Sequence, residues 1–139
     1  MDKTEKKTVT LEMSVNASFS LKVPKTNQAT FKKDLKRGAL CINWHVRYGN
    51  KTKYMGLSSR KFSKGGLKIG KFSGETCQID FSGKVSRELD PNFFEDLMQA
   101  LSKAGSLPLI LQNISTDEGE FYKDGDESAI VDCGTARLV

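Results

Sequence analysis

Apolar and polar residues alternate strictly over one long segment near the start of the chain. Every odd position from 9 to 23 is apolar, and every even position from 10 to 22 is polar. A repeat of two indicates a strand with one buried face and one exposed face. Two structures keep that apolar face single: one long bent strand, or a hairpin with the three-residue loop Val15-Asn16-Ala17.

A short amphipathic helix is expected next. Thr26 or Asn27 is a typical N-cap residue, and Gly38 is a typical C-terminal stop. Phe31 and Leu35 lie about one turn apart and form the apolar face. The polar face carries four cations, Lys32, Lys33, Lys36 and Arg37.

Residues 40–48 and 51–57 predict a β-hairpin. Both segments alternate, and Gly49-Asn50 between them is a signal for a two-residue turn. Pairing the segments around this turn places Trp44 opposite Met55 on the apolar face. Trp44 is therefore expected to pack in the core.

A second hairpin is expected further along the chain. Phe72-Ser73-Gly74 is the expected three-residue loop, with Gly74 in the left-handed conformation. This register sets Ile69 opposite Cys77 and keeps the apolar residues on one face. Residues 58–66, which precede the hairpin, are polar and basic, and they indicate an exposed loop.

The clearest helix signal lies at residues 91–104. Asp90 is an acidic N-cap, and Pro91 suits the first helical position. Gly105 follows as a stop signal. Apolar side chains recur with the spacing of one helix face at Phe94, Leu97, Met98 and Leu101.

The last third of the chain predicts two more strands. Residues 107–114 are mostly apolar, and Pro108 limits that strand to a sheet edge or a strand start. Residues 117–126 are acidic and indicate a solvated loop. Residues 129–131 indicate a last strand.

Together these elements predict an α+β fold. The sheet is expected to be mainly antiparallel, built from the two central hairpins and the long N-terminal strand or hairpin, and covered by one principal helix at about 91–104. A chain of 139 residues fits a single domain over 1–139, with residues 1–7 as a flexible tail.

Charge is distributed very unevenly along the chain. Residues 22–71 contain 14 Lys and Arg and a single acid, Asp34, a local net charge of +13. Residues 72–139 carry a net charge of −8. A concentrated cationic segment favours polyanionic partners.

Aromatic residues interleave with these cations, which favours single-stranded RNA or DNA as the partner, because aromatic rings stack on unpaired bases. Tyr48, Tyr54, Phe62 and Phe72 lie near turns and are the stacking candidates. The candidate nucleic-acid-binding residues are Lys32, Lys33, Lys36, Arg37, Arg47, Tyr48, Lys51, Lys53, Tyr54, Arg60, Lys61, Phe62, Lys64, Lys68 and Lys71.

The sequence gives little indication of catalysis, so we expect a non-enzymatic protein without cofactor or metal. His45 is the sole histidine, and it lies on the polar side of a predicted strand. The acidic residues after 117 lack the order of a calcium-binding loop.

We expect the protein to be intracellular, in the cytoplasm, the nucleus or a virion. The N-terminus lacks the apolar segment of a secretory signal, and no apolar run suits a membrane span. The three cysteines are widely spaced, as is typical of reduced thiols.

The alternative hypothesis is a structural or assembly protein, such as a viral coat or matrix-like protein. In that hypothesis the basic segment of one copy binds the acidic C-terminal part of another, as a homo-oligomer. Residues 107–111 would be an edge strand next to the acidic residues between 117 and 127, and another strand could add to this edge.

Overall fold

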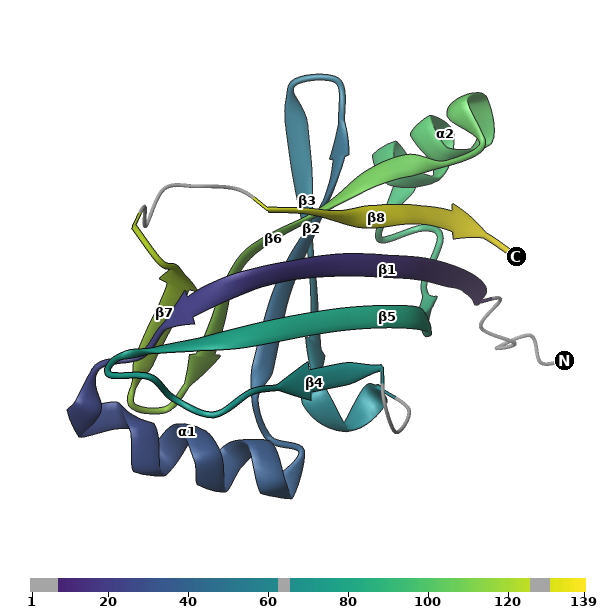
Figure 1. The fold of residues 1–139 in the computed structure, drawn as a ribbon. Coiled ribbons are helices and arrows are strands. Elements are labelled where there is room, and N and C mark those ends of the chain that lie inside the picture. Colours follow the sequence, from purple (N-terminus) through teal and green to yellow (C-terminus); the bar gives the residue numbers. More distant parts are fainter. Residues whose placement is uncertain (1–7, 63–65, 126–130) are drawn as a thin grey trace, which may run out of the picture.

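The long alternating segment folds as one continuous strand. In the computed structural model, which describes residues 8–62, 66–125 and 131–139, β1 (Val9–Lys22) pairs antiparallel with β5 (Thr76–Leu89) along its whole length of 14 residues. Because β5 offers a partner of equal length, no turn is needed within β1. The hairpin alternative at Val15-Asn16-Ala17 is therefore wrong, and the long curved strand is confirmed (Figure 1).

The remaining elements complete an α+β fold, which confirms the expected class. Neighbouring strands follow the order β3-β2-β6-β7-β1-β5-β4, and β8 pairs with both β1 and β6. The other elements are α1 (Lys25–Arg37), β2 (Cys41–Tyr48), β3 (Lys51–Ser58), the short 3₁₀ helix η1 (Ser59–Lys61), β4 (Leu67–Ile69), α2 (Glu95–Ala104), β6 (Leu107–Thr116), β7 (Gly119–Lys123) and β8 (Val131–Leu138).

The hairpin formed by β2 and β3 has the predicted register. Trp44 pairs with Met55, and Tyr48 pairs with Lys51 next to the turn. Gly49 has a φ of 59°, the left-handed conformation that this kind of turn requires. The turn residues and the hydrophobic alternation favour the same register, so the sequence alone predicts the pairing of β2 with β3.

The register predicted for β4 and β5 is wrong by two residues. Ile69 pairs with Ile79 instead of Cys77. The turn is formed by Gly74 and the residue after it, because Ser73 and Thr76 exchange backbone hydrogen bonds of 2.8 and 3.1 Å. A shift of two residues keeps every side chain on its original face, so the apolar pattern could not reveal it.

The sheet folds over on itself around an aromatic cluster. Figure 1 shows β2 and β3 running at a steep angle to β1 and β5. Between them the ring centroid of Trp44 lies 5.1 Å from that of Phe81 and 5.8 Å from that of Phe62. Trp44 is fully buried, as expected. Ring pairs of this kind contribute about 0.5–1.5 kcal/mol each beyond the burial of their area.

The first helix, α1, closes one end of this core. Phe31 is fully buried and makes edge-on contacts with the rings of Phe72 and Phe121. The expected N-cap is wrong, because Pro24 occupies that position and its fixed φ of −53° already suits the helix entry. Gly38 ends α1 with a φ of 70°, as predicted.

The second helix, α2, starts four residues later than predicted. Asp90 holds residues 91–94 in turns, because its side chain accepts the backbone N–H of Asn92 at 2.9 Å and its carbonyl accepts that of Phe94 at 3.2 Å. Leu97 and Leu101 are the buried residues of α2.

Strand β6 lies inside the sheet, so the expected edge strand at residues 107–111 is wrong. It pairs with β2 on one side and with β7 and β8 on the other. Pro108 is the second residue of β6, which confirms the other predicted position, a strand start.

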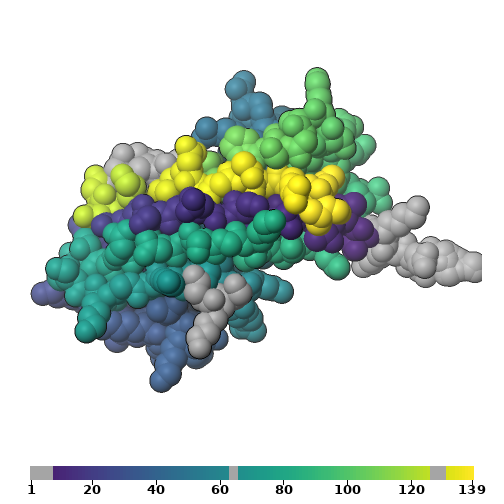
Figure 2. Space-filling model, turned by 45° about the vertical axis from the view of Figure 1, so that its right-hand side comes forward, coloured from purple at the N-terminus to yellow at the C-terminus, as the bar shows by residue number. Residues whose placement is uncertain are grey.

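The acidic segment 117–125 contains a strand, β7, so the prediction of a solvated loop there is wrong. Figure 2 shows the face on which β8, β1 and β5 run side by side between α2 above and α1 below. The predictions for residues 1–7 and 129–130 lie outside the described residues.

Candidate nucleic-acid interface

The predicted basic residues divide between two ends of the molecule. Figure 1 shows the turn of the β2–β3 hairpin at the top and α1 at the bottom. The hairpin end carries Arg47, Tyr48, Lys51 and Lys53. The α1 end carries Lys32, Lys33, Lys36, Arg37, Arg60, Lys61, Lys68 and Lys71. Lys64 lies outside the described residues.

At the α1 end, backbone contacts join the end of α1 to η1. The N–H of Arg60 donates to the carbonyl of Gly38 at 3.2 Å. The N–H of Ser59 donates to the Leu40 carbonyl at 2.8 Å, and the N–H of Leu40 donates to the Ser59 side-chain hydroxyl at 3.1 Å. These contacts assemble what we call the basic cluster, Lys36, Arg37, Arg60 and Lys61.

Most cations at this end have no acidic partner among the residues that the structure describes. Arg37 is the exception, since its guanidinium lies 2.7 Å from the carboxylate of Asp34. Lys68 on β4 lies opposite Asp80 on β5 in the sheet register. Among the described residues, no carboxylate lies within 4.0 Å of the side-chain nitrogens of Lys32, Lys33, Lys36, Arg60, Lys61 or Lys71.

A cavity of about 530 Å³ opens between α1 and the segment that joins β4 to β5. We call it the Phe72 pocket. The Nζ of Lys32 lies 5.4 Å from the centroid of the Phe72 ring. The pocket is lined by Phe31, Lys32, Leu35, Ile69, Gly70, Lys71 and Phe72. It therefore combines an apolar floor with two lysines, Lys32 and Lys71, that have no carboxylate partner among the described residues.

The stacking candidates differ in exposure. Phe62 is half-buried and packs against Trp44 and Phe81, so it belongs to the core and we leave it out of the interface. Tyr54 is 53% exposed, but its ring lies over Gly56, and its hydroxyl donates to Asn43 at 2.9 Å. Phe72 is half-buried and lines a pocket together with Lys32 and Lys71.

The hairpin end is less electropositive than its sequence suggested. Lys51 lies 3.5 Å from the carboxylate of Asp96 on α2, and the Nζ of Lys53 lies 5.6 Å from the centroid of the Phe94 ring. Tyr48 and Lys51 line a cavity of about 520 Å³ against α2, whose Asp96 is part of the lining. Residues distant in sequence thus offset part of this charge.

A hydrogen-bonded polar strip crosses the outer face of β3, β2, β6 and β7, and no local pattern in the sequence predicts it. Asn43 accepts from Tyr54 and donates to Asn113, which in turn donates to Glu120 at 2.9 Å. Tyr122 donates to the same Glu120 oxygen at 2.9 Å. Alternation places Asn43 on a polar face, but only the pairing of β2 with β6 brings it to Asn113.

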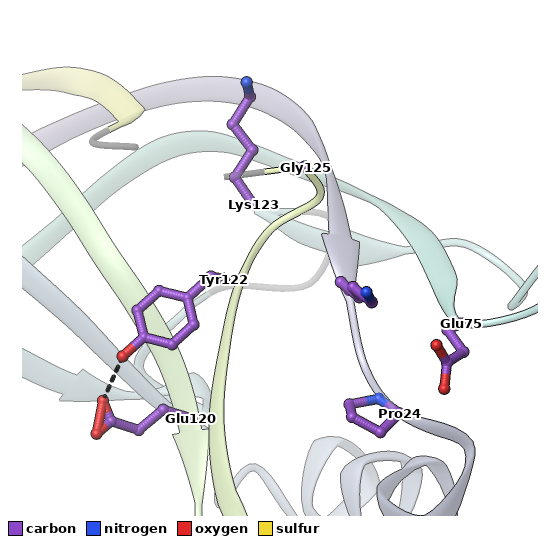
Figure 3. A pocket seen from close by; sticks show the side chains of 7 residues that line it. Pro24, Glu75, Glu120, Tyr122, Lys123 and Gly125 are labelled. Atoms are coloured by element: carbon purple, nitrogen blue, oxygen red, sulfur yellow. Dashed lines mark hydrogen bonds between the residues drawn. The ribbon is translucent and has the colours of Figure 1, made fainter. Parts of the chain in front are cut away.

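Another cavity, of about 470 Å³, lies beside the end of β1 (Figure 3). Its lining includes Lys22 and Lys123, but also the carboxylates of Glu75 and Glu120. Figure 3 shows the hydrogen bond from Tyr122 to Glu120 in its wall. Because the charges of this cavity balance, it suits a polyanion less well than the Phe72 pocket.

Three titratable side chains in the described parts of the chain, His45, Cys77 and Cys133, have pKa values shifted by burial. Partial burial lowers the pKa of His45 below 6.5. Burial raises the pKa of the Cys77 thiol to about 11, and burial together with Asp132 raises that of Cys133 to about 12. Such thiols stay protonated and unreactive at neutral pH, whereas Cys41 is exposed.

Two further observations concern only the described parts of the chain. No group of three or more His, Cys, Asp or Glu side chains is placed to hold a metal ion there. Neither helix in those parts has the length and apolarity needed to cross a bilayer.

Comparison with known proteins gives no relative from which a role could be transferred. No family model matches this chain, and the comparisons with curated proteins and with solved structures find no match either.

Proposed function

We propose that this protein is a non-enzymatic nucleic-acid-binding protein that holds single-stranded RNA or DNA on its α1 end. The observation that supports the proposal is the gathering, around α1, η1 and the Phe72 pocket, of cations that have no acidic partner within the described ranges. Lysine and arginine side chains neutralise phosphates and release counterions, which supplies most of the affinity of sequence-independent binding. The hairpin end, where Asp96 faces Lys51, makes a smaller contribution.

The preference for single strands rests on the pocket. A duplex presents its phosphates but keeps its bases stacked on one another, whereas a single strand can place a base against a protein aromatic ring. The Phe72 ring lies in an open notch among the cations, so both kinds of contact are available at one place.

Labelled oligo-U, oligo-dT and duplex DNA, each titrated at 50 and 200 mM salt, test the proposal. With about six phosphate contacts, single-strand affinity should fall by roughly 10²- to 10³-fold over this range. The proposal would be contradicted by an affinity that does not change with salt, by the absence of binding at 50 mM salt, or by equal affinity for duplex and single-stranded probes. Light scattering of the protein alone at 50 mM salt tests the alternative, since self-assembly through opposite charges requires a multimer without nucleic acid.

A further inference from the structure

The Phe72 pocket has the composition of a site for a flat apolar group attached to anions. Its floor is formed by Phe31, Leu35, Ile69 and Phe72, and a volume of about 530 Å³ lies within the range of ligand sites. Lys32, Gly70 and Lys71 are exposed, so the pocket is a surface notch and not an internal void. An extended chain could therefore pass over it while placing one side group inside.

The two lysines lie on different elements at the rim of the notch. Lys32 belongs to α1, and Lys71 belongs to the segment that leads from β4 to β5. Lys32 reaches over the Phe72 ring, and an exposed lysine can swing away on its flexible stem when a ligand enters. Anionic groups on either side of the ligand would then each meet a cation.

From these contacts we propose that the Phe72 pocket receives one unpaired nucleobase of the bound strand, stacked on the Phe72 ring. The phosphates that flank this base contact Lys32 and Lys71. This inference rests on the proposed function, and it names the part of the ligand that the pocket recognises. Stacking depends on the π-face that every base has, so the pocket tolerates different base identities.

Continuity with the rest of the α1 surface favours a nucleic-acid strand over an isolated small anion. Lys33 and Lys36 extend the row of cations along α1 from the pocket toward η1. Arg60 meets the end of the helix at Gly38. A strand with its base in the pocket would thus find further cations along its backbone.

The test compares two probes of equal charge, a labelled 12-nucleotide oligo-dT and a 12-nucleotide strand in which every site is abasic. Wild-type protein should bind oligo-dT about tenfold or more tightly than the abasic strand, as the loss of one stacked base implies. Phe72→Leu, which keeps an apolar side chain but removes the aromatic face, should bring the ratio of the two affinities close to one. Phe93→Leu is the matched control, because Phe93 is 75% exposed and does not line the pocket.

Phe72 also contacts Phe31, so folding of the variant is checked by its thermal melt. A measurement on the wild type does not depend on the folding of a variant. A 12-nucleotide oligo-dT that carries one 5-iodouracil, irradiated in complex with the wild-type protein, should crosslink to the peptide that contains Phe72. In a separate comparison, Phe72→Tyr should retain the preference for oligo-dT over the abasic strand.

The outcomes separate the two proposals. If neither probe binds at low salt, the proposed function itself is wrong. If both probes bind equally, with the expected salt dependence, the phosphate contacts stand and the base pocket is overturned. Crosslinks confined to other peptides would overturn the base pocket as well.

Discussion

Gly38 and Arg60 are in direct contact although they lie far apart in the sequence. The N–H of Arg60 donates to the Gly38 carbonyl, and a Cβ added at Gly38 would lie 2.8 Å from the Cβ of Arg60. Gly38 also has a φ of 70°, where residues with a side chain are strained. This contact fixes the end of α1 against η1 and thereby holds the basic cluster together.

Gly38→Ala should lower the free energy of unfolding by about 2 kcal/mol or more, because the left-handed backbone and the close approach both penalise a side chain. Urea denaturation measures the change. Gly49→Ala is the matched control: its φ is 59°, but nothing lies within 4 Å of its added Cβ, so it should lose only the backbone part, about 1 kcal/mol. Equal losses in the two variants would show that the contact with Arg60 has no energetic role.

Replacing Lys36, Arg60 and Lys61 together by Gln should weaken binding to all single strands alike. The slope of log affinity against log salt should become shallower by about 2, since three phosphate contacts are lost. Arg37 is left intact in this variant, because its loss would leave Asp34 buried without its partner.

The matched control removes the same number of charges at the hairpin end, with Arg47, Lys51 and Lys53 changed to Gln. A smaller loss of affinity is expected there, because Asp96 already offsets Lys51. A larger effect of the hairpin variant would move the interface to that end. Titrations at several salt concentrations decide between the two ends.

The buried thiols should make the protein less stable at alkaline pH. The native pKa of Cys133, about 12, lies above the value of 9.0 for an exposed thiol, so the unfolded state releases its proton first. This contribution to stability is complete below pH 9 and decreases as pH rises from 9 toward 12. As pH rises from 8.5 to 10.5, Cys133→Ala should therefore lose less unfolding free energy than the wild type does. If the free energy of unfolding changed equally with pH in the two proteins, the raised pKa of Cys133 would be contradicted.

Only one cysteine should react with a thiol reagent in the folded protein. Cys41 is exposed, whereas Cys77 and Cys133 are buried with raised pKa values. Mass spectrometry after brief alkylation at pH 7.5 should find one label, located on Cys41. After denaturation all three thiols should react, and a second label in the native state would show that the core opens there.

The sequence by itself determined the elements whose signals are local. Strict alternation specified which face of β1 is buried, although only the pairing with β5 decided between one long strand and a hairpin. Gly49-Asn50 specified both the β2–β3 turn and its register, because a turn and its adjacent residues are contiguous in the chain. The same reasoning gave the end of α1 at Gly38. It failed by two residues between β4 and β5, where the pattern of faces is identical in both registers.

Only the tertiary structure decided which strands became neighbours and which charges came together. Pro108 limits residues 107–114 to an edge strand or a strand start, and only the pairing with β2, β7 and β8 decided against the edge. The basic segment looks continuous in sequence, but folding carries Lys51 to Asp96 at one end and Arg60 to Gly38 at the other. A charge pattern contains no information about long-range pairing, because the order of strands is set by the summed burial and hydrogen bonding of the whole sheet.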